Sequence, residues 1–233
     1  MQTQYGQILV LAIAFAPCAY AGDLRGYRDF AGTLNHASSV EGAESHGGLG
    51  LKLGLGMTVA TLPGQELVGK ENFYRSDDPD ASTVVMPTIM VVKGLSVPVD
   101  LALVTAFLEN RRISQIAGLA QWTVFEGFAL PAIALRGGLQ RMYGLAASTV
   151  ESLSLDFVAS YGVSYFTFYG SYGEGWHKAH IEDDGGLEAR WDETTYGMGI
   201  RITIVPPFVS LSFEGRTGEG DTNVYAVKLA FGH

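Results

Sequence analysis

Large apolar residues alternate with small or polar ones along most of the chain, and residues 194–206 show this pattern most clearly. One side of an extended strand would carry Tyr196, Met198 and three isoleucines, while the other side would carry glycines, threonine and Arg201. Successive side chains of a strand point to opposite faces, so one face would be apolar and the other polar. A soluble sandwich packs its large apolar residues inside. The pattern here favours a closed barrel whose outer face meets lipid.

Ten segments share this alternation, and most are close to the roughly 9–11 residues that a tilted membrane strand requires. They cover residues 48–62, 83–93, 97–107, 114–125, 131–141, 151–161, 164–173, 194–205, 208–216 and 222–231. An even number of strands puts both ends of the chain on the same side of the membrane. We therefore predict an all-β fold, an antiparallel transmembrane β-barrel of about ten strands with a short helical N-terminal segment. The pattern alone is also compatible with eight or twelve strands.

The connections between these segments predict the orientation of the barrel. Residues 63–82 and 174–193 form two long polar connections, whereas residues 94–96, 162–163 and 206–207 form short ones. Outer-membrane barrels place short turns in the periplasm and longer loops outside. We expect both long, acidic loops to face the outside of the cell.

Composition supports a membrane location and argues against a nucleic-acid partner. Charged residues make up 17% of the chain and its mean hydropathy is +0.17, whereas soluble domains have about 25% charged residues. After residue 21, no stretch approaches the ~20 consecutive apolar residues of a spanning helix. The 30 glycines and 11 tyrosines suit a tight barrel interior and a membrane interface. A net charge of −9 without basic clusters argues against phosphate binding.

The first residues of the chain predict export and a separate N-terminal segment. Residues 1–21 combine a short apolar run with an Ala19-Tyr20-Ala21 cleavage site, although residues 1–7 lack the usual Lys or Arg. A buried helix or a single membrane anchor is the alternative. The only cysteine, Cys18, would leave with the signal peptide, so the mature barrel has no disulfide. We assign residues 1–21 to a signal peptide, 22–46 to a periplasmic N-terminal segment and 47–233 to the barrel.

Apolar residues at helical spacing in the N-terminal segment predict a short amphipathic helix; they are Leu24, Tyr27, Phe30, Ala31 and Leu34. The helix and the linker after it could plug or lid the periplasmic mouth of the barrel. A frayed leader is the alternative. The histidines of this segment, His36 and His46, indicate no specific chemistry.

Polar residues on the inward face of the predicted strands are candidates for the lining of the lumen. Arg or Lys on the lipid face would cost about 2–4 kcal/mol at the membrane midplane, so these side chains are expected to point inward. The candidates are Lys52, Asp100, Gln121, Arg136, Gln140, Asp156, Arg201, Glu214 and Lys228. We expect charges of both signs to pair inside a narrow barrel. A path for ions or small solutes, with Arg136 and Arg201 setting its selectivity, is the alternative.

Aromatic residues near the strand ends predict an interfacial girdle. They are Trp122, Phe125, Tyr143, Tyr161, Phe166, Phe168, Tyr172 and Tyr196. The last strand, which alternates from Tyr225 to Phe231, resembles the C-terminal insertion signal of bacterial outer-membrane β-barrel proteins, with Gly232 and His233 added after the final aromatic residue. Residues 130–138 also resemble a segment of uncharacterised exported barrel proteins. The resemblance implies outer-membrane lipid and the barrel-insertion machinery as partners, and it names no ligand.

The strongest candidate for chemistry is the run from His177 to Asp184, with two histidines and three carboxylates in the connection before the eighth strand. Such residues could bind a metal, but no strand spacing fixes their geometry in a loop. We interpret the run as a solvated acidic loop and expect no metal or other cofactor. No motif of the omptin-like proteases or of the lipid A deacylases is present.

The sequence therefore predicts a non-enzymatic outer-membrane barrel with a structural role or a role in passive transport of small solutes. One alternative is a barrel enzyme that acts on lipid or peptide at its outer rim. Another is a soluble periplasmic β-protein that binds an apolar ligand, with its leucine and isoleucine faces turned inward.

Overall fold

The computed structural model describes residue 28 and residues 31–36, 42–61, 83–108, 113–127, 130–145, 148–181, 187–218 and 222–232. The predicted signal peptide, the long connection 63–82 and the helix positions Leu24, Tyr27 and Phe30 lie outside these ranges.

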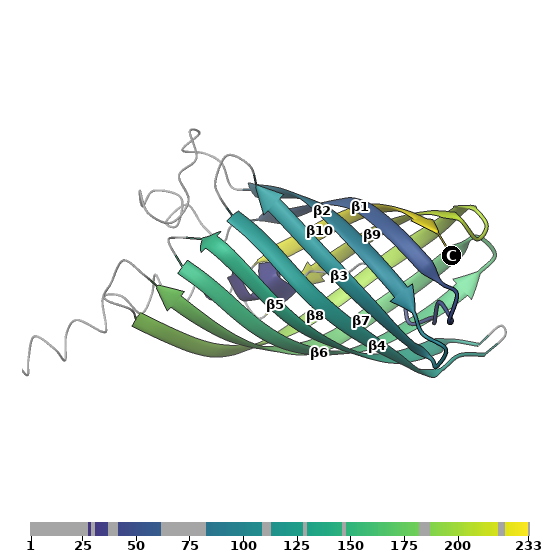
Figure 1. Cartoon of the computed structure of the whole chain (residues 1–233), viewed down its shortest axis with the longest axis horizontal. Coiled ribbons are helices and arrows are strands. Elements are labelled where there is room, and N and C mark those ends of the chain that lie inside the picture. Colours follow the sequence, from purple (N-terminus) through teal and green to yellow (C-terminus); the bar gives the residue numbers. More distant parts are fainter. Residues whose placement is uncertain are drawn as a thin grey trace, which may run out of the picture.

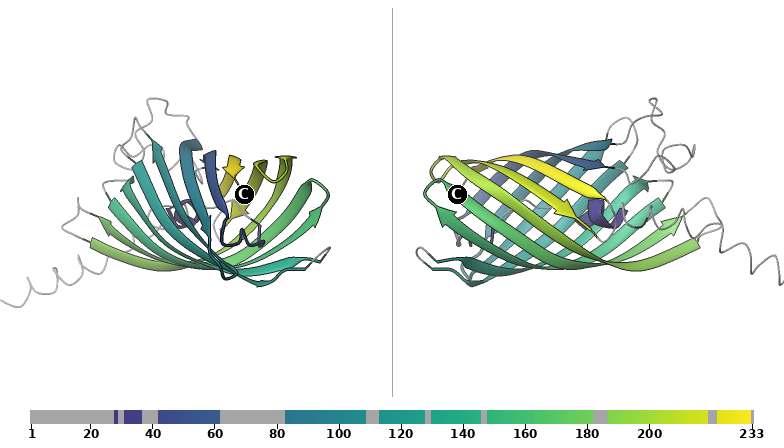
Figure 2. Two further views of the ribbon diagram at one scale, coloured as in Figure 1. Left: turned by 45° about the vertical axis from the view of Figure 1, so that its right-hand side comes forward. Right: turned by 180° about the vertical axis from the view of Figure 1, so that it is seen from behind.

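Ten antiparallel strands form one closed barrel, in which each strand pairs with its neighbours in sequence and β1 pairs with β10 (Figures 1 and 2). The predicted antiparallel barrel of about ten strands is confirmed. The strands are β1 (Leu51–Thr61), β2 (Thr83–Gly94), β3 (Val99–Leu108), β4 (Ile113–Phe125), β5 (Ala132–Leu145), β6 (Ser148–Val163), β7 (Phe166–Ile181), β8 (Leu187–Val205), β9 (Val209–Thr217) and β10 (Asn223–Gly232).

The two ends of the barrel differ. The start of β1 pairs with the end of β10, Lys52 opposite Gly232, so both lie at one end together with the short connections after β2, β6 and β8. Short turns and both chain ends face the periplasm in outer-membrane barrels. We call this the periplasmic end, and the other, which carries the connection from β1 to β2, the outer end.

The wall separates an apolar outer face from a polar interior. Along most of β1 and β6, buried residues alternate with exposed or partly exposed ones. Large apolar side chains such as Leu53, Leu139 and Phe157 are exposed on the outside, as are all eight aromatic residues of the predicted girdle. In lipid every backbone polar group needs an internal partner, and a closed barrel meets that need. The closed wall with its apolar outer face places the protein in the bacterial outer membrane.

This arrangement overturns the alternative of a soluble periplasmic protein, because the leucine and isoleucine faces point outward. Within the described ranges, no helix has both the length and the apolar character needed to cross a membrane.

The prediction of a long acidic loop over residues 174–193 was wrong. Strand β7 continues to Ile181 and β8 begins at Leu187, so that only a short connection joins them. Their 16 and 19 residues exceed the ~9–11 that cross the membrane, so their outer ends extend beyond it. Charged residues at the outer ends of β7 and β8 interrupt the apolar alternation, so residues 174–193 have the composition of a loop.

Part of the N-terminal segment lies inside the barrel. Residues 31–36 form a short helix inside the barrel (Figure 2), residues 42–46 follow the inner wall, and an exposed turn at residues 47–49 leads to the start of β1. Ala31 and Leu34 of the helix are fully buried. Two glycines of the wall make room for it. A Cβ atom at Gly175 would lie 3.0 Å from Nδ1 of His36, and one at Gly218 would overlap Thr33 and Glu193.

Candidate functional site

The candidate site is the lumen of the barrel, which the N-terminal segment occupies. We call residues 31–36 the outer dock and residues 42–46 the inner dock, and the two together the plug. The outer dock contacts residues near the outer ends of the strands, such as Gln115 at the start of β4, and the inner dock contacts residues near their periplasmic ends, such as Ser160 on β6. The described plug therefore runs from the outer end to the periplasmic end.

All nine lumen candidates lie on the inward face of the wall. Eight are buried, and the side chain of Arg201 is 15% exposed. The eight are Lys52, Asp100, Gln121, Arg136, Gln140, Asp156, Glu214 and Lys228. Five of the nine contact the plug directly, namely Lys52, Asp100, Gln121, Asp156 and Arg201.

In the outer dock, His36 binds Asp156 on β6. The imidazole Nε2 lies 2.8 Å from Oδ1 of Asp156, and both side chains are almost fully buried. Arg216 on β9 donates from Nη1 to the backbone carbonyl of His36 at 3.2 Å, and the same nitrogen lies 3.7 Å from the Asp156 carboxylate. Glu214 binds the other end of the guanidinium at 3.3 Å. Asp156 and Arg216 thus contact His36 directly, and Glu214 holds Arg216 in place.

Burial lowers the pKa of His36, because desolvation of the imidazolium outweighs its hydrogen bond to Asp156, which acts in the opposite direction. His36 is therefore neutral in the docked plug at pH 7. Its Nε2 carries the proton and donates it to Asp156, and its Nδ1 has no hydrogen-bond partner among the described residues.

Asn35 makes the second set of contacts of the outer dock. Its Nδ2 donates to Oγ of Ser152 on β6 at 2.5 Å, and Ser152 in turn lies 2.6 Å from Nδ1 of His177 on β7. Gln115 on β4 donates to the side-chain oxygen of Asn35 at 2.9 Å and to its backbone oxygen at 3.1 Å. The side-chain amide is therefore bound on both sides, which fixes the rotation of the helix in the lumen.

Ser152, His177 and Glu193 stand on three neighbouring strands in an order that is typical of nucleophile, base and acid. Nε2 of His177 lies 3.9 Å from Glu193, beyond hydrogen-bond distance. Glu193 also accepts a hydrogen bond from Thr33 of the plug, and Trp191 stacks on the His177 ring at 5.2 Å. Asn35 of the plug lies against the hydroxyl of Ser152. In the docked state Ser152 and Glu193 each bind a residue of the plug, Asn35 and Thr33 respectively.

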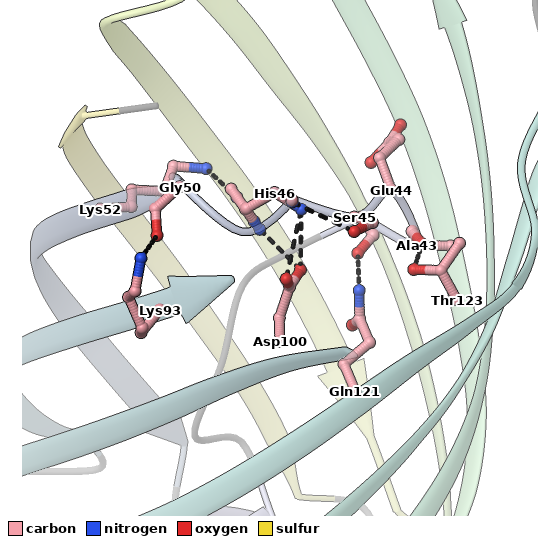
Figure 3. Close-up of polar contacts among 12 residues, drawn as sticks. Ala43, Glu44, Ser45, His46, Gly50, Lys52, Lys93, Asp100, Gln121 and Thr123 are labelled. Atoms are coloured by element: carbon pink, nitrogen blue, oxygen red, sulfur yellow. Dashed lines mark hydrogen bonds and ion pairs between the residues drawn. The ribbon is translucent and has the colours of Figure 1, made fainter. Parts of the chain in front are cut away.

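The inner dock is centred on His46 and Asp100 of β3 (Figure 3). The carboxylate of Asp100 accepts a hydrogen bond from Nδ1 of His46 at 2.7 Å and two from its backbone nitrogen at 3.1 and 3.2 Å. Lys52 donates to the remaining ring nitrogen of His46 at 3.3 Å. One carboxylate thus binds both the backbone and the side chain of the same plug residue.

Backbone carbonyls of the plug supply further contacts of the inner dock. Gln121 donates to the carbonyl of Gly42 at 2.9 Å, and Thr123 donates to that of Ala43 at 2.8 Å. Arg136 orients Gln121 through hydrogen bonds of 3.0 and 2.7 Å to its side-chain oxygen.

Glu44 of the inner dock forms an ion pair with Arg201 of β8 at 3.3 Å. Arg201 also donates to Thr167 at 3.1 Å. The predicted pairing of lumen charges is therefore realised to a large extent through the plug.

The other lumen candidates contact the wall. Gln140 donates to Ser154 at 3.2 Å, and the ammonium of Lys228 lies 3.8 Å from the sulfur of Met90. Beside the inner dock, a cavity of about 20 Å³ lies between His46, Asp100 and Arg136, which is enough for about one water molecule.

Sequence analysis missed several residues of the site. The interpretation of His36 and His46 as nonspecific was wrong, since each binds a buried carboxylate. Arg216 lies two positions beyond Glu214 on the same face of β9, so strict alternation could have identified it. No sequence signal indicates which strand a plug residue meets.

The two histidines of the candidate metal-binding segment lie on opposite sides of the barrel wall. His177 is buried in the lumen and His180 is exposed on the outside, because residues three apart on a strand point to opposite faces. Among the described residues, no three His, Cys, Asp or Glu side chains are grouped so that they could hold a metal ion.

Comparisons with known proteins find only solved structures of low similarity. No family model and no curated protein matches the chain. The solved structure of a loop-deletion mutant of OmpT, an outer membrane protein of Vibrio cholerae, aligns with 10% identity and a TM-score of 0.33 over 69% of this chain and 61% of its own length. The chain thus spans less than two thirds of that protein.

Two other outer-membrane barrels align over most of their length. The KdgM porin gives 8% identity and a TM-score of 0.39, with 77% of this chain and 98% of the porin covered. Omp33 of Acinetobacter baumannii gives 7% identity and a TM-score of 0.36, with coverages of 80% and 100%. At these values the likeness concerns the general fold alone.

Proposed function

We propose that the protein is a passive channel for small solutes in the outer membrane and that its own N-terminal segment holds it closed. The observation that carries this proposal is that plug residues bind to six strands of the inner wall, including β1, whose Lys52 binds His46. His36 binds Asp156 on β6, His46 binds Asp100 on β3, and Glu44 binds Arg201 on β8. Gln115 on β4 and Arg216 on β9 complete the set.

If the plug were a permanent filling of the barrel, the inner wall behind it would not need polar residues, because apolar side chains fill a narrow barrel at lower desolvation cost. Here the wall behind the plug carries Lys52, Asp100, Arg136, Asp156 and Glu214, all buried. Once the plug leaves, water can solvate these groups, so the open state has a hydrated lining. Charges of both signs then predict weak selectivity between anions and cations.

The proposal is tested by single-channel recording in planar bilayers. The purified chain is compared with a variant that lacks residues 22–46, and both are first shown to be folded by their change of gel mobility on heating. We expect the complete chain to conduct rarely and the deletion variant to conduct continuously. A silent deletion variant would identify a structural barrel, and equal conductance of the two would show that the plug does not close the lumen.

A barrel enzyme is the second candidate, because Ser152 lies 2.6 Å from His177 and thus has a base within reach. A fluorophosphonate that reacts with activated serines tests this directly. Labelling of Ser152 in the deletion variant, abolished by His177→Gln, would support the enzyme. Ser154, which bonds Gln140 instead, provides the control: Ser154→Ala should leave any labelling unchanged.

A further inference from the structure

The outside of the barrel wall carries a groove of about 540 Å³ that crosses β3 to β7 in the outer half of the barrel. Its floor is apolar and exposed; it consists of Leu103, Ile116, Leu139, Leu153 and Trp176. Ligand sites for small molecules commonly measure about 300–1,000 Å³. The groove is therefore large enough to hold a chemically defined ligand, and its apolar floor lies on the outer face of the wall.

A glycine creates the hollow. Gly118 on β4 lies between Leu103 and Leu139 in the pairing register, so a row of outward leucines is interrupted by a position without a side chain. A Cβ atom at Gly118 would meet no other atom within 4 Å. The space over this residue is therefore open, and a side chain introduced there would occupy the groove without clashing with the wall.

Charged residues form the outer rim of the groove. Arg141, Glu151 and Lys178 follow one another across β5, β6 and β7 in the pairing register, two residues beyond the apolar floor. Arg141 lies 3.5 Å from Glu151, and Lys178 lies 2.8 Å from Glu188. The lining of the groove holds two cations and one carboxylate, in a chain whose net charge is −9.

The depth of the rim in the membrane follows from its charges. Cations on the lipid face cost about 2–4 kcal/mol at the midplane and close to nothing at the interface. The row from Arg141 to Lys178 therefore marks the outer interface, and Trp176 lies where interfacial aromatics are usual. The floor lies at the level of the acyl chains of the outer leaflet, and the rim lies at the level of their headgroups.

We propose that this groove binds one phosphorylated acyl lipid of the outer leaflet. The acyl chain lies on the leucine floor over Gly118, and the phosphate accepts hydrogen bonds from Arg141 and Lys178. Arginine and lysine are the usual protein ligands of phosphate. The proposal concerns the outer face of the wall and is independent of the plug and of conduction.

The experiment is native mass spectrometry of the complete folded chain in detergent, titrated with phosphatidylglycerol. Phosphatidylcholine and a diacylglycerol with the same chains are the comparison lipids. Because phosphatidylcholine carries the same phosphodiester, we expect one molecule of either phospholipid to remain bound under activation that removes the diacylglycerol. Loss of a hydrogen bond to a charged group corresponds to a factor on the order of ten in affinity, so this is the effect expected of Arg141→Gln and of Lys178→Gln.

Gly118→Leu tests the floor, and it should abolish the retained lipid by filling the hollow. Its matched control is Gly137→Leu, an outward glycine on β5 that does not line the groove and whose Cβ atom would only touch a backbone oxygen at 3.9 Å. Lys93→Gln, an exposed cation at the periplasmic end, is the charge control. Both control variants should keep the wild-type affinity.

Three results would overturn the proposal. The first is equal retention of all three lipids, which indicates a nonspecific annular layer. The second is an equal loss of affinity in Gly137→Leu and Gly118→Leu. The third is displacement of the lipid by a second copy of the chain, seen as a dimer that Gly118→Leu disrupts.

Discussion

The outer and inner docks hold the same segment in the same lumen, but they differ in burial. Side chains of the outer dock are almost completely buried, with Asn35 at 0% and His36 at 2% exposure. In the inner dock the side chain of His46 is 14% exposed and that of Glu44 is 25% exposed. Buried polar contacts are costly to break singly, whereas partly solvated ones lose little because water replaces the lost partner. The plug is therefore fixed most firmly at the outer end and should open first at the periplasmic end.

The largest effect is expected from Asp156→Ala, which removes the carboxylate of the outer dock. The variant leaves the N–H of His36 without its acceptor. It also breaks the buried ion pair of Asp156 with Arg216, which keeps Glu214 as its acidic partner, and breaking a buried ion pair costs about 3–5 kcal/mol. Urea unfolding in detergent measures the loss, and single-channel recording should show frequent opening. Asp192→Ala on the outside of β8 is the control, since Asp192 is exposed. Equal effects of the two variants would show that the outer dock has no special role.

Asn35→Ala should have the next largest effect. It leaves Gln115 and the Ser152–His177 pair without their plug partner in a buried environment, at a cost of about 1–3 kcal/mol. The same unfolding measurement applies. Ser45→Ala serves as the control in the inner dock, because the Ser45 hydroxyl accepts one exposed hydrogen bond from the backbone of Gly47 and its loss should change stability by less than about 0.5 kcal/mol. An unaffected Asn35→Ala variant would contradict the ranking of the two docks.

The sequence predicted the wall far better than its contents, and there is a physical reason. Alternation along a strand is a local property, so the inward face could be identified for Asp156 and Arg201 without knowledge of any partner. The pairing of His36 with Asp156 spans 120 residues and depends on how far the plug enters the lumen. The outer ends of β7 and β8 were missed because they leave the membrane, where lipid no longer requires apolar residues on the outside.

Asp100→Asn should selectively loosen the inner dock. The amide keeps one acceptor oxygen for His46 but removes the charge, so we expect a loss on the order of 1 kcal/mol and little change in the outer dock. Ser45→Cys supplies a reporter, since the chain contains no cysteine after residue 18. A thiol reagent added to the periplasmic side should react faster in the Asp100→Asn background. If the two docks open separately, the Ser45→Cys thiol should react more slowly in the Asp156→Ala background than in the Asp100→Asn background. Identical rates in the two backgrounds would mean that the plug moves as one unit.

The smallest effect expected is a weakening of the outer dock on acidification. The pKa of His36 is lowered in the docked plug, so the docked state binds fewer protons than a released plug, whose histidine titrates near ~6.5. Stability from this group is therefore fully present above that pH and is lost as the pH falls below it. Asp156, Arg216, Arg136 and His177 are the ionisable groups that face His36 from the wall. Open probability in bilayers should rise as the pH is lowered from 7.5 to 5.5. His36→Gln should flatten this response, because glutamine takes up no proton in either the docked or the released plug. A channel that closes more tightly on acidification would contradict the assignment of a neutral His36 to the docked plug.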